Sequence, residues 1–155
     1  MNANTAIKWD APDADHPART ASRRSIAAVA VGAKQQWLSL FATDAVVEDP
    51  VGPSWLDPDG LGHRGTSQIA HFWDQTVANI ANFQFHVADS FVGGNACANV
   101  ATITSTLADG TAMTIDAVLV YTINDKGLIT SLRAHWEPDR ALATITPAAP
   151  TAPPR

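Results

Sequence analysis

The sequence predicts a single α+β domain in which helices cover one face of a curved antiparallel sheet. Apolar residues recur at helical spacing in the first half of the chain, whereas apolar and polar residues alternate in the second half, as in strands. Turn motifs at residues 108–110 and 124–127 separate the alternating runs. Helices and strands segregated in this way form α+β domains, and a curved sheet with one covered face closes into a cone with an apolar interior.

Three helices are expected before the sheet. The first begins near residue 15, has Pro17 in its first turn and ends at the break at Gly32. A second short helix is predicted over residues 35–41, and a third over residues 66–80, where Ile, Phe and Trp recur at helical spacing.

One strand is expected between the second and third helices, and the others follow the third helix. These strands are predicted over residues 45–49, 83–87, 98–107, 113–123 and 128–136. The resulting organisation is a flexible arm over residues 1–14, a domain over 15–140 and a disordered Pro- and Ala-rich tail over 141–155.

The composition limits the class of partner. Hydrophobic residues make up 46% of the 155 residues and charged residues only 16%, which indicates an apolar cavity or an oligomer interface beside one core. The net charge of −5 disfavours nucleic acid and anionic membranes, because both select a basic face. The one cysteine, Cys97, allows no internal disulfide, and no signal peptide is evident, so a cytoplasmic location is expected.

Asp49 is the most unusual residue of the predicted sheet. Side chains alternate between the two faces of a strand, so Asp49 shares a face with Ala45 and Val47, while Val46 and Glu48 point the other way. A carboxylate on the apolar face could act as a general base in a pocket. It could equally end the strand and cap the Asp-Pro turn, and the residues alone leave both interpretations open.

Other candidate motifs give weaker evidence of function than Asp49. Tyr121, on the face of Leu119, could donate a hydrogen bond to a ligand oxygen or lie at a wet rim. Residues 60–65 fit G-x-G-x-x-G but lack the preceding strand of a dinucleotide site. The five histidines have no zinc-site spacing, so neither a metal nor a cofactor is expected.

Several segments nevertheless resemble one family. Residues 41–52, Phe-Ala-Thr-Asp-Ala-Val-Val-Glu-Asp-Pro-Val-Gly, resemble a strand of the ketosteroid isomerases, which are steroid Δ5-isomerases with the NTF2-like (SnoaL-like) cone fold. Residues 65–73 resemble the third helix of that family, and 127–134 its last strand. The resemblance spans about residues 17–138 and implies a cone with three helices on one face and a homodimer.

The resemblance also implies a function. Asp49 would be the base that moves a proton within a 3-keto-Δ5 steroid or a similar apolar ketone, shifting its double bond. The residues expected to line the substrate pocket are Phe41, Trp55, Trp73, Leu119, Leu132 and Trp136.

Both oxyanion donors of the family are replaced. The family tyrosine of the first helix falls on Ser25 and the family aspartate on Leu119, with Tyr121 as a possible substitute donor. One alternative is therefore a non-catalytic protein that binds steroids or other hydrophobic small molecules. Another is an epoxide hydrolase or polyketide cyclase, which strand parity disfavours because Arg133 points away from the apolar face.

Overall fold

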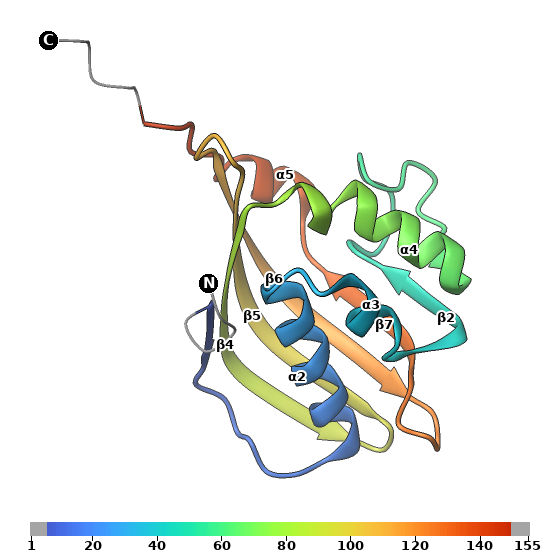
Figure 1. The fold of residues 1–155 in the computed structure, drawn as a ribbon. Helices are drawn as coiled ribbons and strands as arrows, with labels where there is room; N and C mark the ends of the chain where they lie inside the picture. Colours follow the sequence, from blue (N-terminus) through green and yellow to red (C-terminus); the bar gives the residue numbers. More distant parts are fainter. Residues whose placement is uncertain (1–5, 150–155) are drawn as a thin grey trace, which may run out of the picture.

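The computed structural model describes residues 6–149, in which one curved seven-stranded sheet partly encloses three helices (Figure 1). The strand order is β1-β4-β5-β6-β7-β2-β3. The strands are β1 (Ile7–Trp9), β2 (Phe41–Glu48), β3 (His63–Arg64), β4 (Asn82–Gly93), β5 (Ala96–Thr106), β6 (Ala112–Ile123) and β7 (Ile129–His135). The helices are α2 (Pro17–Ala30), α3 (Lys34–Leu38), α4 (Gly65–Gln75), the 3-10 turn η1 (Val77–Asn79) and α5 (Pro138–Leu142). The predicted α+β class and three-helix cone are confirmed.

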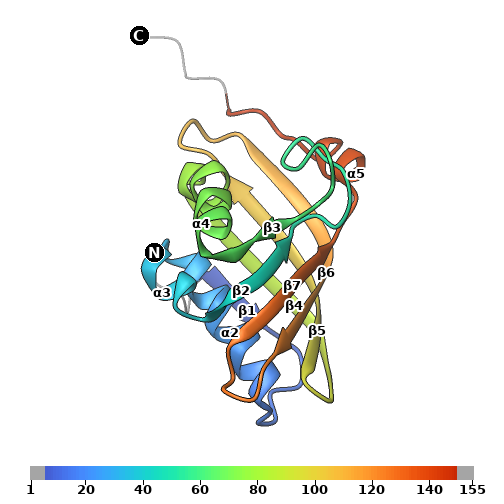
Figure 2. The same cartoon turned by 90° about the vertical axis from the view of Figure 1, so that its right-hand side faces the viewer.

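The sheet is mixed rather than wholly antiparallel. Strands β4 to β7 form an antiparallel meander, but β1 pairs in parallel with β4, and β2 pairs in parallel with β7. The second pairing sets Val47 beside Leu132. Because parallel strands end at the same edge, the residues that follow β2 and β7 lie close together (Figure 2).

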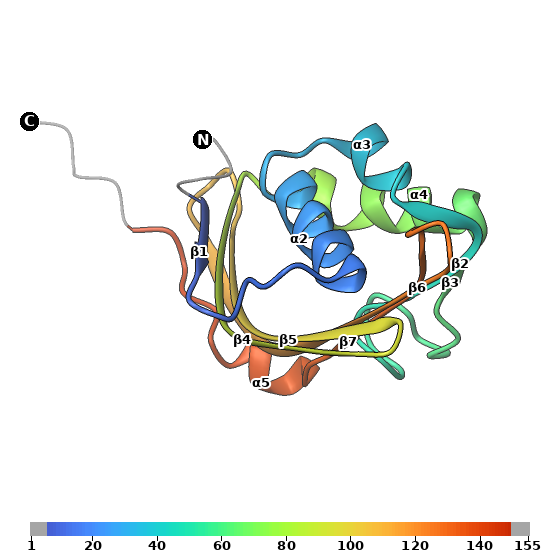
Figure 3. The same ribbon diagram turned by 90° about the horizontal axis from the view of Figure 1, so that it is seen from below.

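The helices divide between the two faces of the sheet. Helices α2, α3 and α4 lie on the concave side, and the short α5 lies against the convex side (Figure 3). Small alanines on α2, including Ala18 and Ala21, are buried and let this helix approach the strands closely. His16 caps the N-terminus of this helix: its Nδ1 accepts a hydrogen bond from the Ala18 amide at 3.1 Å. Pro17 follows at the first helical position.

Several boundaries differ from the sequence prediction. The second helix ends at Leu38, and the apolar Phe41 begins β2 instead of closing that helix. Residues 7–9, expected in a flexible arm, form β1, whose parallel bonds use the open edge of β4. Residues 1–5 and 150–155, at the ends of the expected arm and tail, lie outside the described residues.

Part of the expected disordered tail is also ordered. Strand β7 pairs only with the later part of β6, which leaves the first residues of β6 unpaired on that side. The tail fills this gap, because Thr146 exchanges backbone hydrogen bonds with Ala112 at 2.9 Å and Thr144 Oγ1 donates to the Thr114 carbonyl. No helix among residues 6–149 is long and apolar enough to cross a membrane.

Candidate functional site

A cavity of about 280 Å³ lies between the concave face of the sheet and the helices. Its wall is mostly apolar and combines side chains from α2, α4 and strands β4 to β7 with the loop after β2. Six of the eight predicted site residues line it: Asp49, Trp55, Leu119, Tyr121, Leu132 and Trp136. Such an apolar cavity with few polar groups is typical of small-molecule sites.

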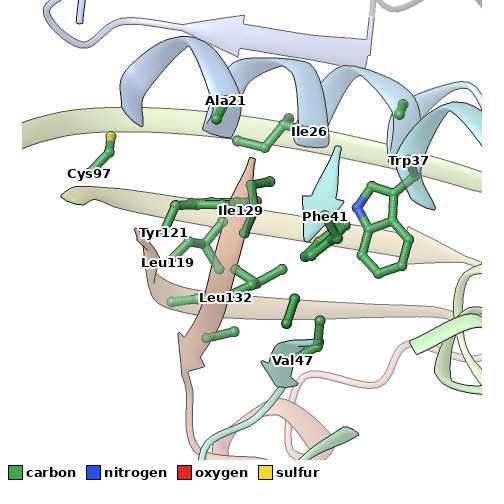
Figure 4. Close-up of a cluster of buried hydrophobic side chains, with 14 of the residues drawn as sticks. Ala21, Ile26, Trp37, Phe41, Val47, Cys97, Leu119, Tyr121, Ile129 and Leu132 are labelled. Carbon is green, nitrogen blue, oxygen red and sulfur yellow. The ribbon is translucent and has the colours of Figure 1, made fainter. Parts of the chain in front are cut away.

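The other two predicted pocket residues lie in the packed core. Phe41 and Trp73 are 8% and 3% exposed. The Phe41 ring packs against Trp37 with ring centroids 4.6 Å apart (Figure 4), and the Trp73 ring packs against Trp37 at 5.2 Å. Helix α4 turns Phe72 toward the cavity instead, and so places its neighbour Trp73 against α3. The expectation that Phe41 and Trp73 line the pocket was therefore wrong. Helix rotation decides which of the two adjacent aromatic residues of α4 faces the cavity, and Phe41, at the start of β2, packs beneath α3 against Trp37.

Asp49 follows the last residue of β2 and presents its carboxyl group to the cavity. Val47, two residues earlier on the same face, is fully buried, in agreement with the alternation read from the sequence. Trp136, which follows β7, donates its indole N–H to Asp49 Oδ1 at 2.6 Å. Burial raises the pKa of Asp49 above its usual value, and the hydrogen bond from Trp136 partly opposes this.

The loop between β2 and β3 contributes to the cavity mouth. Trp55 is 47% exposed and its ring meets that of Trp136 edge-on, with centroids 5.8 Å apart. Asp57 Oδ2 accepts from the Gly62 amide at 2.7 Å and closes the loop. Gly62 has φ of +77°, and a Cβ there would lie 2.9 Å from Glu48 Cγ, so glycine lets the returning chain lie against β2.

The cavity wall contains a hydrogen-bonded set of three side chains, of which the sequence identified only Tyr121 as a candidate site residue. Ser25 Oγ on α2 accepts from Trp37 Nε1 at 3.0 Å and from the Tyr121 hydroxyl at 3.1 Å. Burial raises the pKa of Tyr121, the bond to Ser25 opposes this, and the negative charge of Asp49 adds to it. The one sequence signal was that Ser25 occupies the position of the family tyrosine; nothing local marked Trp37.

The remaining candidate motifs lie outside the cavity lining. Arg133 is on the outer face, where its Nε donates to Glu48 Oε2 at 2.6 Å, as strand parity predicted. The glycine-rich residues 60–65 lead through β3, antiparallel to β2, into α4. Among residues 6–149, no group of three or more His, Cys, Asp or Glu side chains could hold a metal ion.

The fold and cavity agree with comparisons to known proteins. Residues 22–132 match the SnoaL-like domain family, and the chain belongs to this family. A steroid delta-isomerase from Nocardioides simplex is 29% identical over 126 residues, which cover 81% of this chain and 94% of the relative. The resemblance to ketosteroid isomerases seen in the sequence is confirmed.

Two solved structures extend the comparison. A Δ5-3-ketosteroid isomerase from Mycobacterium sp. is 31% identical, with a TM-score of 0.76 over 85% of this chain and 98% of its own. A Mycobacterium tuberculosis protein in complex with estradiol-17β-hemisuccinate is 30% identical, with a TM-score of 0.76 over 85% of this chain and 99% of its own. The chain is thus similar over most of its length both to an isomerase and to a protein with a bound steroid derivative.

Proposed function

We propose that this protein is an isomerase that shifts a carbon–carbon double bond in a 3-keto-Δ5 steroid or a similar apolar ketone, with Asp49 as the base. The observation that carries the proposal is the position of Asp49, a half-buried residue whose carboxyl group lines an apolar cavity and has a raised pKa. A raised pKa brings a carboxylate closer to the basicity that proton abstraction from carbon requires. The similarity to steroid isomerases supports the choice of substrate class.

The reaction needs one base that both removes and returns a proton. Ionised Asp49 takes a proton from the carbon between the carbonyl group and the double bond. The electron pair of the broken C–H bond stays on the substrate, which becomes a dienolate. Asp49 then returns the proton at the far end of the dienolate, which leaves the double bond conjugated with the carbonyl group. The Trp136 N–H donates to Oδ1 of the carboxylate. Among residues 6–149 no donor is recorded for Oδ2, so this oxygen can face the substrate.

The dienolate oxygen needs a hydrogen-bond donor on the wall away from Asp49. Leu119 occupies the position of the family aspartate and offers none, although it lines the cavity. Tyr121 is the notable polar side chain of the same strand face, and it is buried and hydrogen-bonded to Ser25. We assign the donor function to this part of the wall.

The test is conversion of androst-5-ene-3,17-dione, followed by the rise of conjugated-enone absorbance. Asp49→Asn is expected to lower kcat by about 10²–10⁴-fold, because the amide cannot accept the proton. Asp44→Asn, on the exposed part of β2, is the matched control and should keep wild-type activity. Equal inactivity of the wild-type protein and Asp49→Asn would refute the catalytic proposal.

A non-catalytic binding protein is the second candidate function. The replacement of a polar donor by Leu119 in an otherwise apolar wall favours it. Four tryptophans lie in or beside the cavity wall: Trp37, Trp55, Trp73 and Trp136. Quenching of tryptophan fluorescence by a steroid ketone, without its turnover, would select this function.

We also propose that the protein works as a cytoplasmic homodimer, as the family resemblance implies. On the convex face, the cross-strand neighbours Val100 and Val118 are 40% and 39% exposed. This apolar surface would suit contact with a second copy of the chain.

A further inference from the structure

Three polar side chains in the cavity wall are removed from solvent but still face the cavity. Ser25, Trp37 and Tyr121 are 1%, 2% and 2% exposed, and all three line the cavity. The indole nitrogen of Trp37 points to the side from which Tyr121 rises off β6 (Figure 4). Their polar atoms must therefore be satisfied by each other or by a ligand.

The hydrogen bonds within this set have a defined direction. An indole N–H can only donate, so Ser25 Oγ accepts from Trp37. The Tyr121 hydroxyl also donates to Ser25 Oγ. Both acceptor positions of this one hydroxyl oxygen are therefore occupied.

One hydrogen remains unused. The three side chains carry three polar hydrogens and make two hydrogen bonds among themselves, and the remaining hydrogen is that of Ser25. Among residues 6–149, Ser25 Oγ donates to no recorded acceptor, unlike the neighbouring Ser22, which donates to the Arg19 carbonyl at 2.8 Å. A buried donor without an acceptor is costly, and a ligand oxygen in the cavity would remove that cost.

We propose that Ser25 is the direct hydrogen-bond donor to the ligand oxygen, and that Trp37 and Tyr121 are positioning residues that act through it. Two donors converging on one hydroxyl polarise its O–H bond, so the remaining hydrogen bond becomes stronger toward an anionic oxygen. The site then favours an enolate or phenolate over a neutral hydroxyl. This inference rests on the proposed function for the identity of the cavity, and within that part of the wall it names Ser25 as the oxyanion donor in place of Tyr121, the candidate from the sequence.

The test uses 2-naphthol, a flat apolar phenol whose phenolate absorbs beyond the absorbance of protein. Binding is measured in Asp49→Asn protein, because the amide mimics the neutral carboxyl group present once a substrate proton has been taken up. The readout is the pKa of bound naphthol, obtained from absorbance as a function of pH. A donor in the wall lowers this pKa by favouring the phenolate.

Ser25→Ala is expected to reduce the preference for phenolate about tenfold or more, since a hydrogen bond to a charged group is lost. Tyr121→Phe and Trp37→Phe should each reduce it only about threefold, because Ser25 keeps its hydrogen and loses polarisation alone. Binding of neutral naphthol at low pH checks that each variant retains the cavity, and a purely structural effect would weaken both ionisation forms alike.

A larger loss of phenolate preference in Tyr121→Phe than in Ser25→Ala would overturn the proposal and make Tyr121 the direct donor. Wild-type phenolate preference in Ser25→Ala would also overturn it. The measurement requires no turnover, so dependence on Ser25 without isomerase activity would remove the proposed function and leave this inference standing. Isomerase activity together with a phenolate preference that does not depend on Ser25 would support the proposed function and overturn this inference.

Discussion

Two groups of buried polar side chains involve helix α2, and they differ in whether they face the cavity. One is the closed cluster, which consists of Arg19, Ser22, Ser90, Cys97 and Asn99, all 5% exposed or less. The other is the cavity triad, which consists of Ser25, Trp37 and Tyr121. The two lie on successive turns of one helix and meet the same sheet.

Every polar side-chain atom of the closed cluster makes a hydrogen bond, within the cluster or to a nearby backbone carbonyl. Arg19 donates to the Ala14 carbonyl at 2.8 Å and to Ser90 Oγ at 3.1 Å. Asn99 Nδ2 donates to Ser22 Oγ at 3.0 Å, and Asn99 Oδ1 accepts from the Cys97 thiol. No cavity residue takes part, so this cluster serves to fix α2 on the sheet.

The cavity triad has one hydrogen more than it can use and is open to a ligand. Burial of polar groups does not by itself mark a functional site. What distinguishes the two groups is position: the cavity triad lines the cavity, where the unused hydrogen of Ser25 can reach a ligand, and the closed cluster does not. The first of three further predictions, given in decreasing order of expected effect, tests this distinction, and the other two test the environment of Asp49.

Arg19→Met is expected to lower the free energy of unfolding by about 2–3 kcal/mol, because the buried Ser90 hydroxyl and carbonyl and the Ala14 carbonyl lose their donor. Urea denaturation measures the change, and the phenolate preference of the folded variant should stay that of the wild type. Arg24→Met on the exposed side of the same helix is the control, with an effect of about 0.5 kcal/mol or less. If Arg19→Met were as stable as the wild-type protein, the closed cluster would not fix α2.

Trp136→Phe is expected to move the acid limb of the kcat/KM profile up by about one pH unit. The indole N–H favours the ionised carboxylate of Asp49, and its loss lets burial raise the pKa further. If turnover is absent, carbon-13 NMR titration of the Asp49 carboxyl group gives the same quantity. Trp55→Phe contacts the same ring but donates nothing to Asp49, so an equal shift in that variant would contradict the prediction.

Asp49→Asn is expected to stabilise the protein by about 1 kcal/mol at pH 7. The pKa of Asp49 is raised on folding, so the folded state binds this proton more tightly than the unfolded state. The wild-type protein therefore has no penalty below the usual carboxyl pKa and loses stability as the pH rises through the raised folded-state pKa. Urea denaturation should show the advantage of Asp49→Asn shrinking toward pH 3.8, while Asp44→Asn, the control, shows no such trend.

The alternation of residues in the sequence was sufficient to predict which face of strands β2 and β6 is buried. Alternation placed Asp49 with Ala45 and Val47, and both of these neighbours are fully buried. The same reasoning set Leu119 and Tyr121 on one face, and both line the cavity. The alternation of side chains along a strand involves only a few consecutive residues, so it can be predicted without knowledge of the rest of the chain.

Which side chains meet could not be predicted from the sequence, because these contacts depend on tertiary packing. Trp136 reaches Asp49 from 87 residues away because β2 and β7 pair in parallel, a register that neither strand specifies locally. Ser25 meets Tyr121 across 96 residues because α2 packs over β6. Periodicity gives the direction of a side chain on its own element, whereas partners depend on strand register and helix packing, which the whole core sets together.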